Sequence, residues 1–357
     1  MSPALPRGSV IGCLGTGQLG RMLALAAAPL GYRVHAYGPE QRGPLQQVTD
    51  QSTCADYDDE AALAEFAAAV DVVTYEFENV PAHTAAFLQA RVPVRPGPAV
   101  LAISQDRLVE KRFIQSCGGR TAEVRAVYTR RDLDHAVRTL GLPAVLKTRR
   151  FGYDGKGQVV LRDAYPANLD RAWELLRGVP CVLEAFVPFA FEASVVVARG
   201  MDREARCYPL VQNVHRNHIL WQTHAPAQVA PAVDVAAREL AVRMARRVEL
   251  IGVMAVEFFV LEDGGLVVNE IAPRPHNSGH WTQDGCATSQ FEQQTRAVVG
   301  LPLGPLEPVR PTVMTNLLGH EIDELDAYFA DPSCRVHVYG KTEPRPGRKM
   351  GHVNRLG

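Results

Sequence analysis

The sequence predicts an α/β protein with two or three domains, and three observations support this class. The chain has 357 residues, which exceeds one ordinary domain, and 46% of them are apolar, enough for a sizeable core. Residues 9–38 follow the order strand, glycine turn, helix and strand, which is how an α/β unit starts. Beyond the proline-rich segment RVPVRPGPAV at 91–100, short strands dominate, so a domain boundary is expected there.

The N-terminal unit is expected to form a parallel sheet with helices. Its first strand is the apolar run 10–14, and an alanine- and leucine-rich helix then extends to about Leu30. A second strand begins at 34–37. The segment DVVTYEFENVP at 71–81 is expected to be a later parallel strand with polar residues at its carboxyl end, where open α/β sheets bind ligands.

The glycine turn GTGQLG at 15–20 matches the pattern G-x-G-x-x-G. Such a turn can bring helix N–H groups to a phosphate. A dinucleotide-binding domain also has an acid at the end of its second strand, which holds the ribose hydroxyls. This chain has Tyr37 and Gly38 there, and the nearest acid is Glu40. The turn is therefore expected to hold a different phosphate, or simply to pack the helix on the strand.

The central part of the chain is expected to be rich in short strands, with a clear helix at 233–249 and another near 105–117. The expected strands are LPAVLKTRR, GQVVLRD, PCVLEAFV, FEASVVVARG, GVMAVEFFV and LVVNEIA. A second proline-rich segment, LPLGPLEPVRP at 301–311, predicts another boundary before a small β-containing tail.

Net charge and cysteine usage argue against several classes of function. A formal net charge of −1 gives no long-range attraction to nucleic acid or to an anionic membrane. The seven cysteines are scattered and include no C-x-x-C, which argues against a disulfide framework or a zinc cluster. The N-terminus has no long apolar region and no apolar run reaches 18 residues, so a cytoplasmic location is expected.

Two glutamates indicate a metal site. Glu257 and Glu270 lie in apolar runs that flank EDGG, a hairpin turn signal. With Asp263 and Gly264 as the two turn residues, the glutamates face each other across the hairpin, where like charges need a cation between them. Two hard carboxylates suit magnesium, which shares its ligand shell with nucleotide phosphates. The alternative is that each glutamate pairs with a nearby arginine.

The segment RRFGYDGKGQ at 149–158 indicates a phosphate-binding loop, because its glycines let N–H groups approach phosphate oxygens and Lys156 adds charge. An ordinary flexible hairpin is the alternative. Lys147 favours phosphate, since an ammonium at the end of an apolar run needs an anion. The next strand ends in Glu184 and runs on to Glu192, either as an edge for adenine and ribose or as plain core.

Polar residues gather in NEIAPRPHNSGHWTQDG at 269–285, directly after the second metal candidate. Arg274, His276, Asn277 and His280 follow one another closely there. A lone histidine is more often structural, but this combination is typical of a site that handles anions and a metal together.

The tail segment YGKTEPRPGRKMGH at 339–352 gathers Lys341, Arg345, Arg348 and Lys349, and by itself it could be a solvated basic surface. Together with the other motifs it resembles the ATP-grasp superfamily, and within it the 5-(carboxyamino)imidazole ribonucleotide synthase family. The stretches that carry the resemblance are GTGQLGRML, TYEFENVP, FGYDGKGQ, NEIAPRPHNSGHWTQ and PRPGRKMGH, which together cover nearly the whole chain. NSGHWTQ and PGRKMGH are the specific ones.

The resemblance implies an α/β chain of ATP-grasp architecture that acts as a homodimer. A Rossmann-like pre-ATP-grasp domain is expected at 1–104, an ATP-grasp domain at 105–304 with a mobile lid at about 120–187, and a small β region completing the substrate site at 305–357. The implied enzyme is an ATP-dependent ligase of purine biosynthesis. It converts ATP, bicarbonate and 5-aminoimidazole ribonucleotide, through carboxyphosphate, to ADP, phosphate and the N-carboxylated ribonucleotide.

The resemblance also assigns roles to individual residues. The residues expected to bind ATP are Arg107, Lys147, Gly152, Tyr153, Asp154, Gly155, Lys156, Gly157, Gln158, Glu184, Ala185, Phe186, Val187, Glu192, His215, Asn269 and Glu270. Magnesium is placed on Glu257 and Glu270. Many ATP-grasp enzymes have E-x-N after the second metal glutamate, whereas this chain reads Glu270-Ile271-Ala272. The metal shell is therefore expected to depend more on the two glutamates and on phosphate oxygens.

A second group is expected to surround bicarbonate and the ribonucleotide. Its members are Glu76, Tyr153, Asp154, Lys156, Arg274, His276, Asn277, Lys341, Arg348 and Lys349. Among them, Asp154, Lys349, Arg274, His276 and Asn277 are expected to be catalytic. Asp154 would handle the proton of the substrate amine, helped by Lys349.

Three other functions are weighed against this one. A formate-dependent glycinamide ribonucleotide transformylase is a close alternative, but HNSGHWTQ argues against it. A nicotinamide oxidoreductase is disfavoured by the missing ribose acid. A non-catalytic nucleotide sensor is disfavoured by the intact pair of glutamates at 257 and 270.

Overall fold

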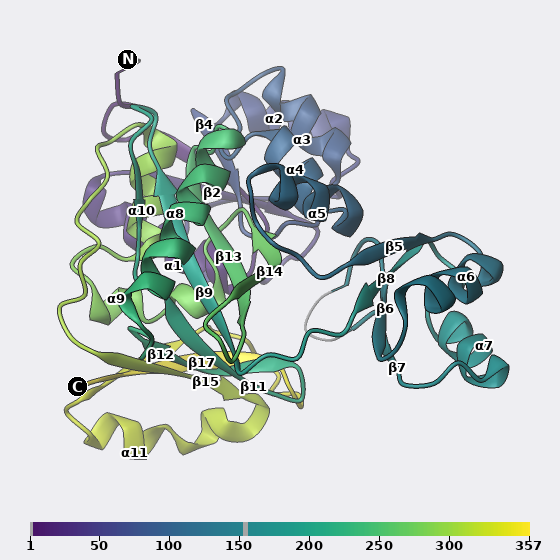
Figure 1. The fold of residues 1–357 in the computed structure, drawn as a ribbon. Coiled ribbons are helices and arrows are strands. Elements are labelled where there is room, and N and C mark those ends of the chain that lie inside the picture. Colours follow the sequence, from purple (N-terminus) through teal and green to yellow (C-terminus); the bar gives the residue numbers. More distant parts are fainter. Residues whose placement is uncertain (1–2, 153–155) are drawn as a thin grey trace.

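The computed structural model describes residues 3–152 and 156–357 and confirms the predicted α/β class. Figure 1 shows a parallel sheet with helices in the N-terminal part and a large antiparallel sheet that runs through the centre into the C-terminal part. A smaller α/β unit stands apart from both (Figure 1). The C-terminal strands thus do not form a separate sheet, because they extend the central one.

The N-terminal sheet has the parallel order β3-β2-β1-β4. Leu14 pairs with both Tyr37 and Tyr75, so the carboxyl ends of β1, β2 and β4 share one edge. Helix α1 ends at Ala27, earlier than expected, because Pro29 has no N–H to continue it. The elements are β1 (Val10–Leu14), α1 (Gln18–Ala27), η1 (Ala28–Leu30), β2 (Arg33–Gly38), η2 (Leu45–Gln47), β3 (Gln51–Cys54), α2 (Glu60–Ala68), β4 (Val72–Tyr75), α3 (Ala82–Gln89) and α4 (Pro98–Ser104).

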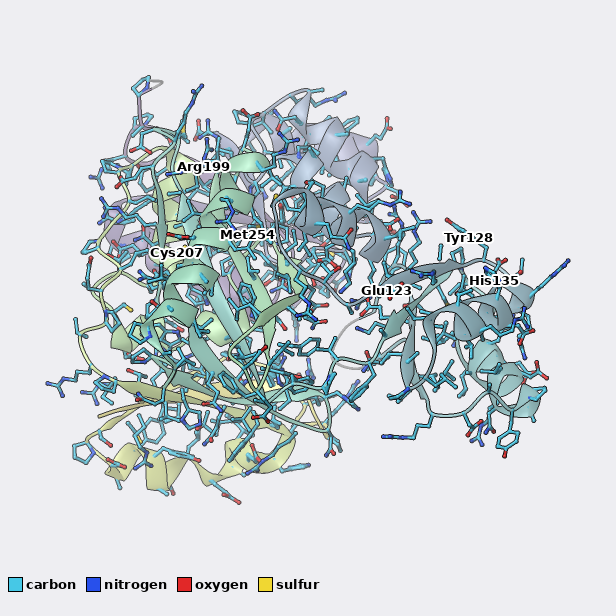
Figure 2. The ribbon with its side chains drawn as sticks, viewed as in Figure 1. Glu123, Tyr128, His135, Arg199, Cys207 and Met254 are labelled. Carbon is cyan, nitrogen blue, oxygen red and sulfur yellow. The ribbon has the colours of Figure 1, made fainter. Side chains whose placement is uncertain are left out.

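The smaller unit has the antiparallel order β5-β8-β6-β7 and lies within the range expected for a lid. It has its own core, which includes Leu133, Leu146 and Leu183. Figure 2 shows Tyr128 and His135 in this unit. Motion of the unit stays a prediction. The elements are β5 (Val124–Val127), α6 (Arg130–Leu140), β6 (Ala144–Thr148), β7 (Gln158–Leu161), α7 (Pro166–Leu175) and β8 (Cys181–Ala185).

The central sheet has the order β14-β13-β9-β11-β12-β15-β17-β16, and β10 pairs with β9. Its strands are β9 (Phe191–Arg199), β10 (Ala205–Cys207), β11 (Val211–Arg216), β12 (Ile219–Ala225), β13 (Gly252–Val260), β14 (Leu266–Ala272), β15 (Thr312–Leu318), β16 (Cys334–Val338) and β17 (Lys349–Leu356). The accompanying helices are α5 (Arg107–Ser116), α8 (Pro231–Arg247), η3 (Asn277–Gly279), α9 (Thr282–Gly285), α10 (Gln290–Val299), η4 (Gly319–Glu324) and α11 (Leu325–Ala330).

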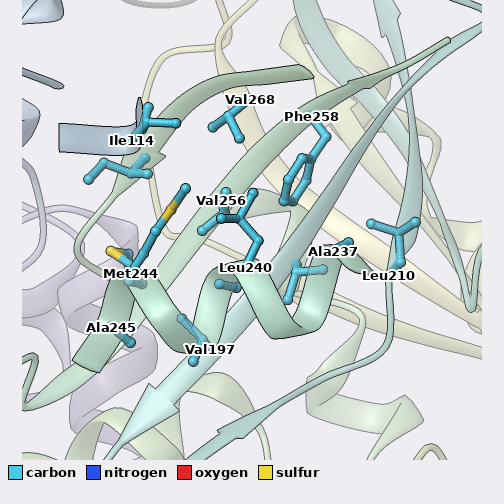
Figure 3. Packing of buried hydrophobic residues seen from close by; sticks show 14 of the residues in the cluster. Ile114, Val197, Leu210, Ala237, Leu240, Met244, Ala245, Val256, Phe258 and Val268 are labelled. Carbon is cyan, nitrogen blue, oxygen red and sulfur yellow. The ribbon is translucent and has the colours of Figure 1, made fainter. Parts of the chain in front are cut away.

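Strand β13 is buried on both faces, which explains its nearly continuous apolar sequence GVMAVEFFV. Val256 and Phe258 pack with Met244 of α8 in the cluster shown in Figure 3. Val253 and Ala255 belong to a second cluster on the opposite face, which includes part of α10. Because side chains alternate along a strand, Glu257 projects to the α10 face.

In residues 3–152 and 156–357, no helix is both long and apolar enough to cross a bilayer. All seven cysteines are free thiols. A cytoplasmic location stays a prediction.

Candidate active site

Glu257 on β13 and Glu270 on β14 pair directly across the ladder, as predicted. The predicted two-residue turn is wrong, however. A backbone hydrogen bond of 2.9 Å between Leu261 and Gly265 closes a loop of three residues. Such a loop alone would put the glutamates out of register. A bulge at Asn269 shifts β14 by one residue and restores the pairing.

Each glutamate of the pair contacts one nitrogen-bearing side chain. Glu257 Oε1 lies 3.0 Å from His276 Nε2, and Glu270 Oε2 lies 3.1 Å from Arg107 Nη1. Burial works to raise the pKa of Glu257, but the His276 imidazole overcomes this and the pKa falls to about 2. The alternative of two arginine pairs therefore holds for Glu270 only, and Glu257 is held in its charged form beside a histidine.

The hairpin presents oxygen donors that fit magnesium. The buried Oδ1 of Asn269, at the bulge, has no hydrogen-bond partner among the described atoms. With Glu257 and Glu270 it makes a set of hard oxygen donors. Within the described ranges no three His, Cys, Asp or Glu side chains gather into a metal site, so phosphate oxygens would have to complete the shell. The residues fit the metal, and magnesium itself stays a prediction.

A buried ion-pair cluster lies beside the hairpin. Lys147 Nζ is 2.8 Å from Glu184 Oε2, and Lys111 Nζ is 3.4 Å from Glu184 Oε1. Burial works to raise the pKa of Glu184, but the two ammonium groups lower it to about 2. Burial also lowers the pKa of Lys147. The anion that Lys147 was expected to need is therefore, in part, the protein's own Glu184.

Lys111 is a site residue that sequence reasoning missed. It is 1% exposed, and its Nζ also donates to the carbonyl oxygen of Asn269 at 2.8 Å. It thereby connects the ion-pair cluster to the bulge of the hairpin. A signal was present in the sequence, because Lys111 is spaced by three residues from the buried Leu108 and Ile114 on the same helix face.

The first turn of α5 directs Arg107 to the hairpin. Asp106 caps this helix by accepting from the N–H groups of Leu108 and Val109, at 3.1 and 3.3 Å. Its carboxylate also accepts from Arg149 Nε at 2.8 Å. Burial works to raise the pKa of Asp106, but these contacts lower it. Asp106 thus connects the start of the glycine loop to the helix that carries Arg107.

The glycine loop joins β6 to β7, and Lys147 pairs with Gln158 across its base. Gly157 has a φ of +73°, and a Cβ there would lie 2.7 Å from Thr148 Oγ1, so the position requires glycine. The expected site residues at positions 153–155 (Tyr153, Asp154 and Gly155) lie outside the described residues. Their roles stay predictions.

The segment after β14 is tied to other parts of the chain. Arg274 forms an ion pair with Glu78 of the N-terminal unit, and although burial works to lower the pKa of Arg274, Glu78 raises it. The amide of Asn277 exchanges hydrogen bonds of 2.9 and 2.8 Å with the amide of Asn316. Glu78 and Asn316 were both missed. Glu78 could have been found, because it stands two residues after Glu76 in TYEFENVP.

The far side of the site is formed by β9, β11 and β17. Glu192 of β9 and His215 of β11 form an ion pair. Burial works to lower the pKa of His215, but Glu192 raises it, against an opposing effect of the Lys349 ammonium. Lys349 also helps burial to lower the pKa of His280. Lys349, the first residue of β17, therefore lies close to the segment after β14 that carries His280.

The tail folds back onto the central sheet. Lys341 Nζ donates to the carbonyl oxygen of Lys349 at 2.7 Å, so these two expected substrate residues lie together. Arg348 Nη1 donates to the carbonyl oxygen of Glu343 at 2.9 Å, and the Arg348 carbonyl oxygen accepts from Gly319 N–H at 2.8 Å. The tail is thus an ordered turn, and its contact with a ribonucleotide stays a prediction.

Glu76 lies in the glycine turn of the N-terminal unit. Its carboxylate accepts from the N–H of Gly17 and, at 2.7 Å, from that of Gly20. A Cβ at Gly15 or at Gly17 would lie 2.6 Å from Glu76 Oε1. Burial raises the pKa of Glu76, although the two N–H groups oppose this. The glycines therefore admit the protein's own carboxylate, where the sequence left open either a phosphate or simple packing of the helix, and this also argues against a dinucleotide there.

Comparison with known families agrees with this arrangement. Residues 9–105 match the ribonucleotide synthetase preATP-grasp domain, 112–291 the ATP-grasp domain and 312–357 the phosphoribosylaminoimidazole carboxylase C-terminal domain. An N5-carboxyaminoimidazole ribonucleotide synthase of Brucella melitensis is 46% identical over 353 residues, covering 99% of this chain and 98% of that protein. The chain belongs to the N5-carboxyaminoimidazole ribonucleotide synthase family.

Solved structures of this family have the same fold. One N5-carboxyaminoimidazole ribonucleotide synthetase, in complex with ADP, has a TM-score of 0.96 and 42% identity, covering 100% of this chain and 94% of that one. The Aspergillus clavatus N5-carboxyaminoimidazole synthase, in complex with ADP and 5-aminoimidazole ribonucleotide, has a TM-score of 0.91 and 31% identity, covering 98% and 94%.

A longer relative contains the same region. The chain spans 37% of a bifunctional purine synthesis protein of Dictyostelium discoideum and is 45% identical to it over 371 residues, 98% of this chain. Together the comparisons confirm the ATP-grasp architecture with its preATP-grasp and C-terminal parts. The expected boundaries at 104 and 304 stay predictions.

Proposed function

We propose that this chain carboxylates 5-aminoimidazole ribonucleotide at its exocyclic amine, with cleavage of ATP to ADP and phosphate. The single observation that carries the proposal is the facing pair Glu257 and Glu270, which lies beside the Lys147–Glu184 ion pair in a member of this ligase family. The pair and the cluster offer what phosphoryl transfer requires, namely positioning and neutralisation of charge.

ATP is held between the small unit and the central sheet. Lys147 and Arg107 supply positive charge to its phosphates, and Glu184 holds the Lys147 ammonium in place. The other residues of this role are Gly152 to Gln158, Ala185 to Val187, Glu192, His215 and Asn269. Magnesium, when bound by Glu257 and Glu270, would offset the negative charge of the phosphate oxygens.

The proposed reaction has three steps. An oxygen of bicarbonate attacks the γ-phosphorus, the bond to the bridging oxygen of ADP breaks, and carboxyphosphate forms. Carboxyphosphate then releases phosphate and carbon dioxide, and the amine nitrogen bonds to that carbon. Asp154 accepts the amine proton, helped by Lys349. Because carboxyphosphate is labile in water, a unit that closes over it has a clear purpose.

The ribonucleotide lies between the tail and the edge of the N-terminal sheet where β1, β2 and β4 end. Glu76, Tyr153, Lys156, Arg274, His276 and Asn277 surround its reacting part and the bicarbonate. Arg348 grips its 5′-phosphate, and Lys341 adds a point charge. The protein acts as a homodimer in the cytoplasm.

The test is ADP release in bicarbonate buffer with and without 5-aminoimidazole ribonucleotide. The proposal expects release that depends on both compounds. Release that persists when formate replaces bicarbonate and glycinamide ribonucleotide replaces the imidazole would instead identify the formate-dependent alternative.

A further inference from the structure

Helix α10 carries three glutamines with no place in the proposed reaction. Gln290, Gln293 and Gln294 are each 0% exposed. Glutamine is mostly found at surfaces, and a buried amide is tolerated only when its hydrogen bonds are satisfied. The bonds that each one makes therefore show what it holds in place.

Gln290 clamps the backbone of His276 from both sides. Its Oε1 accepts from the His276 N–H at 2.9 Å, and its Nε2 donates to the His276 carbonyl oxygen at 2.7 Å. Only one orientation of the amide satisfies both contacts. The same Nε2 lies 3.0 Å from Nδ1 of His280. One side chain thus fixes the main chain of a proposed catalytic residue.

The surrounding loop is shaped to admit this side chain. A Cβ at Gly279 would lie 2.3 Å from Gln290 Oε1, so the glycine of NSGHW leaves room for the amide. Thr282 Oγ1 donates to the Gly279 carbonyl oxygen at 2.6 Å and accepts from the Gln290 N–H at 2.9 Å. The loop and the first turn of α10 are therefore built around one another.

The ring of His276 is held as well as its backbone. Its Nδ1 lies 2.9 Å from Ser278 Oγ, which accepts from Ser194 Oγ at 2.7 Å. With the backbone clamped and Nδ1 engaged, Nε2 is directed at Glu257 Oε1, 3.0 Å away. Gln290 holds the main chain of His276, and this determines where the His276–Glu257 contact lies relative to Glu270, the other glutamate of the predicted metal site.

We propose that Gln290 is a positioning residue of this active site, which acts through His276 to fix the His276–Glu257 contact. The inference rests on the proposed function only in assigning His276 and Glu257 to the reaction. A small displacement of a group that orients reactants can lower the rate by as much as roughly a hundredfold, so the effect falls on turnover.

Gln293 provides a matched control on the same helix. Its Nε2 donates to the Gly304 carbonyl oxygen at 2.7 Å, and its Oε1 accepts from the Gly304 N–H at 3.0 Å. It therefore makes the same two-bond clamp, at the same burial, on a residue with no proposed role. Methionine at either position has a similar shape and removes both side-chain bonds to the clamped residue, whose carbonyl oxygen keeps a second donor, Gly279 N–H for His276 and Arg206 Nη1 for Gly304.

The first experiment compares Gln290→Met with Gln293→Met below both melting temperatures. We expect both variants to lose thermal stability to a similar extent. Gln290→Met should lower kcat by roughly tenfold or more with the KM for ATP within about twofold, whereas Gln293→Met should keep kcat within about twofold. Equal losses of kcat in the two variants would overturn the proposal.

A double-mutant cycle tests whether Gln290 acts through His276. In the His276→Ala background, Gln290→Met should cause no further loss of kcat, because the group that it positions is gone. Losses that multiply would show that Gln290 acts elsewhere. If Gln290→Met fails to fold, Gln290→Glu takes its place, because only the protonated carboxyl can copy both contacts, so its activity relative to wild type should fall as pH rises.

An activity-independent measurement separates this inference from the proposed function. The imidazole NMR signals of His276, assigned by their loss in His276→Ala, should move in Gln290→Met and stay in place in Gln293→Met. Unmoved signals in Gln290→Met would contradict the clamp even if the enzyme carboxylates the ribonucleotide. If the wild-type protein released no ADP in response to the ribonucleotide, the proposed function would be refuted. The NMR signals of His276 would still show whether Gln290 holds its main chain.

Discussion

The glycine turn after β1 and the glutamate pair on β13 and β14 are both candidate ion sites in the sequence, the turn with simple packing as its alternative. In the structure their polar groups find different partners. In the turn, Glu76 accepts the N–H groups that a phosphate would otherwise receive. On the hairpin, Glu257 contacts His276 and Glu270 contacts Arg107, while the two carboxylates face each other. The N–H groups of a turn can thus find an acceptor within the chain. Two carboxylates that face each other still favour an added cation between them.

The largest effect is expected at Glu270, where a substitution tests whether the glutamate pair holds a cation. We expect Glu270→Gln to keep the fold, since this side chain is 39% exposed, and to lower turnover by roughly a hundredfold or more through loss of charge at the phosphates. ADP release during a magnesium titration measures the effect. Glu262→Gln, on the exposed loop of the same hairpin, is the control. Near-normal activity of Glu270→Gln at limiting magnesium would remove the metal assignment.

Since Glu76 occupies the glycine turn, the 5′-phosphate of the ribonucleotide needs a site elsewhere, and the tail offers one. We expect Arg348→Ala to raise the KM for 5-aminoimidazole ribonucleotide by roughly tenfold or more, which corresponds to the loss of one charge-assisted contact. The KM for ATP should hardly change. Steady-state kinetics with each substrate varied in turn measures both values.

The dephosphorylated nucleoside is the control for this phosphate contact. Its weak use should be the same in Arg348→Ala and in the wild type, because it lacks the group that Arg348 binds. If the substitution weakened ATP and ribonucleotide equally, or neither, the tail would be a solvated surface.

The fold and the hairpin could be predicted because their signals are local. Strand β1 was placed at its observed bounds by an apolar run, and the Glu257–Glu270 pairing by a turn signal. The turn length was wrong, and the pairing survived only because of the bulge at Asn269. No local pattern marks a bulge that compensates for a turn, so this part of the site was out of reach of sequence.

The partners from distant segments were missed for a different reason. Asn316 lies 39 residues from Asn277 along the chain, and Glu78 lies 196 residues from Arg274. The N-terminal turn likewise receives Glu76, which directly follows β4 and lies 56 residues beyond Gly20. These contacts follow from how strands are ordered in the sheets, which one sequence does not encode in any short pattern.

The contribution of the Glu76 hydrogen bonds to the stability of the glycine turn can itself be tested. We expect Glu76→Gln to lower the free energy of unfolding by about 1–3 kcal/mol, because an amide offers one acceptor oxygen where two N–H groups now bond. Denaturant unfolding measures it. Glu40→Gln is the control, since Glu40 meets the same turn only through Thr16 Oγ1 and is exposed. Equal, small changes in both variants would show that the turn does not depend on Glu76.

The smallest effect concerns pH and the cluster beside the hairpin. The pKa of Glu184 is lowered to about 2 from an ordinary value of 4.5, against the effect of burial, by Lys147 and Lys111. A carboxyl with a depressed folded-state pKa stabilises the fold fully above its unfolded-state value, and this contribution is lost as pH falls from about 4.5 through about 2. Lys111→Met should therefore destabilise the protein most near neutral pH.

The difference in stability between wild type and Lys111→Met should then narrow as the pH falls, because protonated Glu184 no longer attracts the ammonium. It should not vanish, since Lys111 also donates to the Asn269 carbonyl oxygen, a contact that does not titrate. Denaturant melts of both proteins from pH 7 down to the acid limit of folding measure the difference. A difference that stays constant over this range would mean that Lys111 stabilises the site through Asn269 alone, and that Glu184 depends on Lys147.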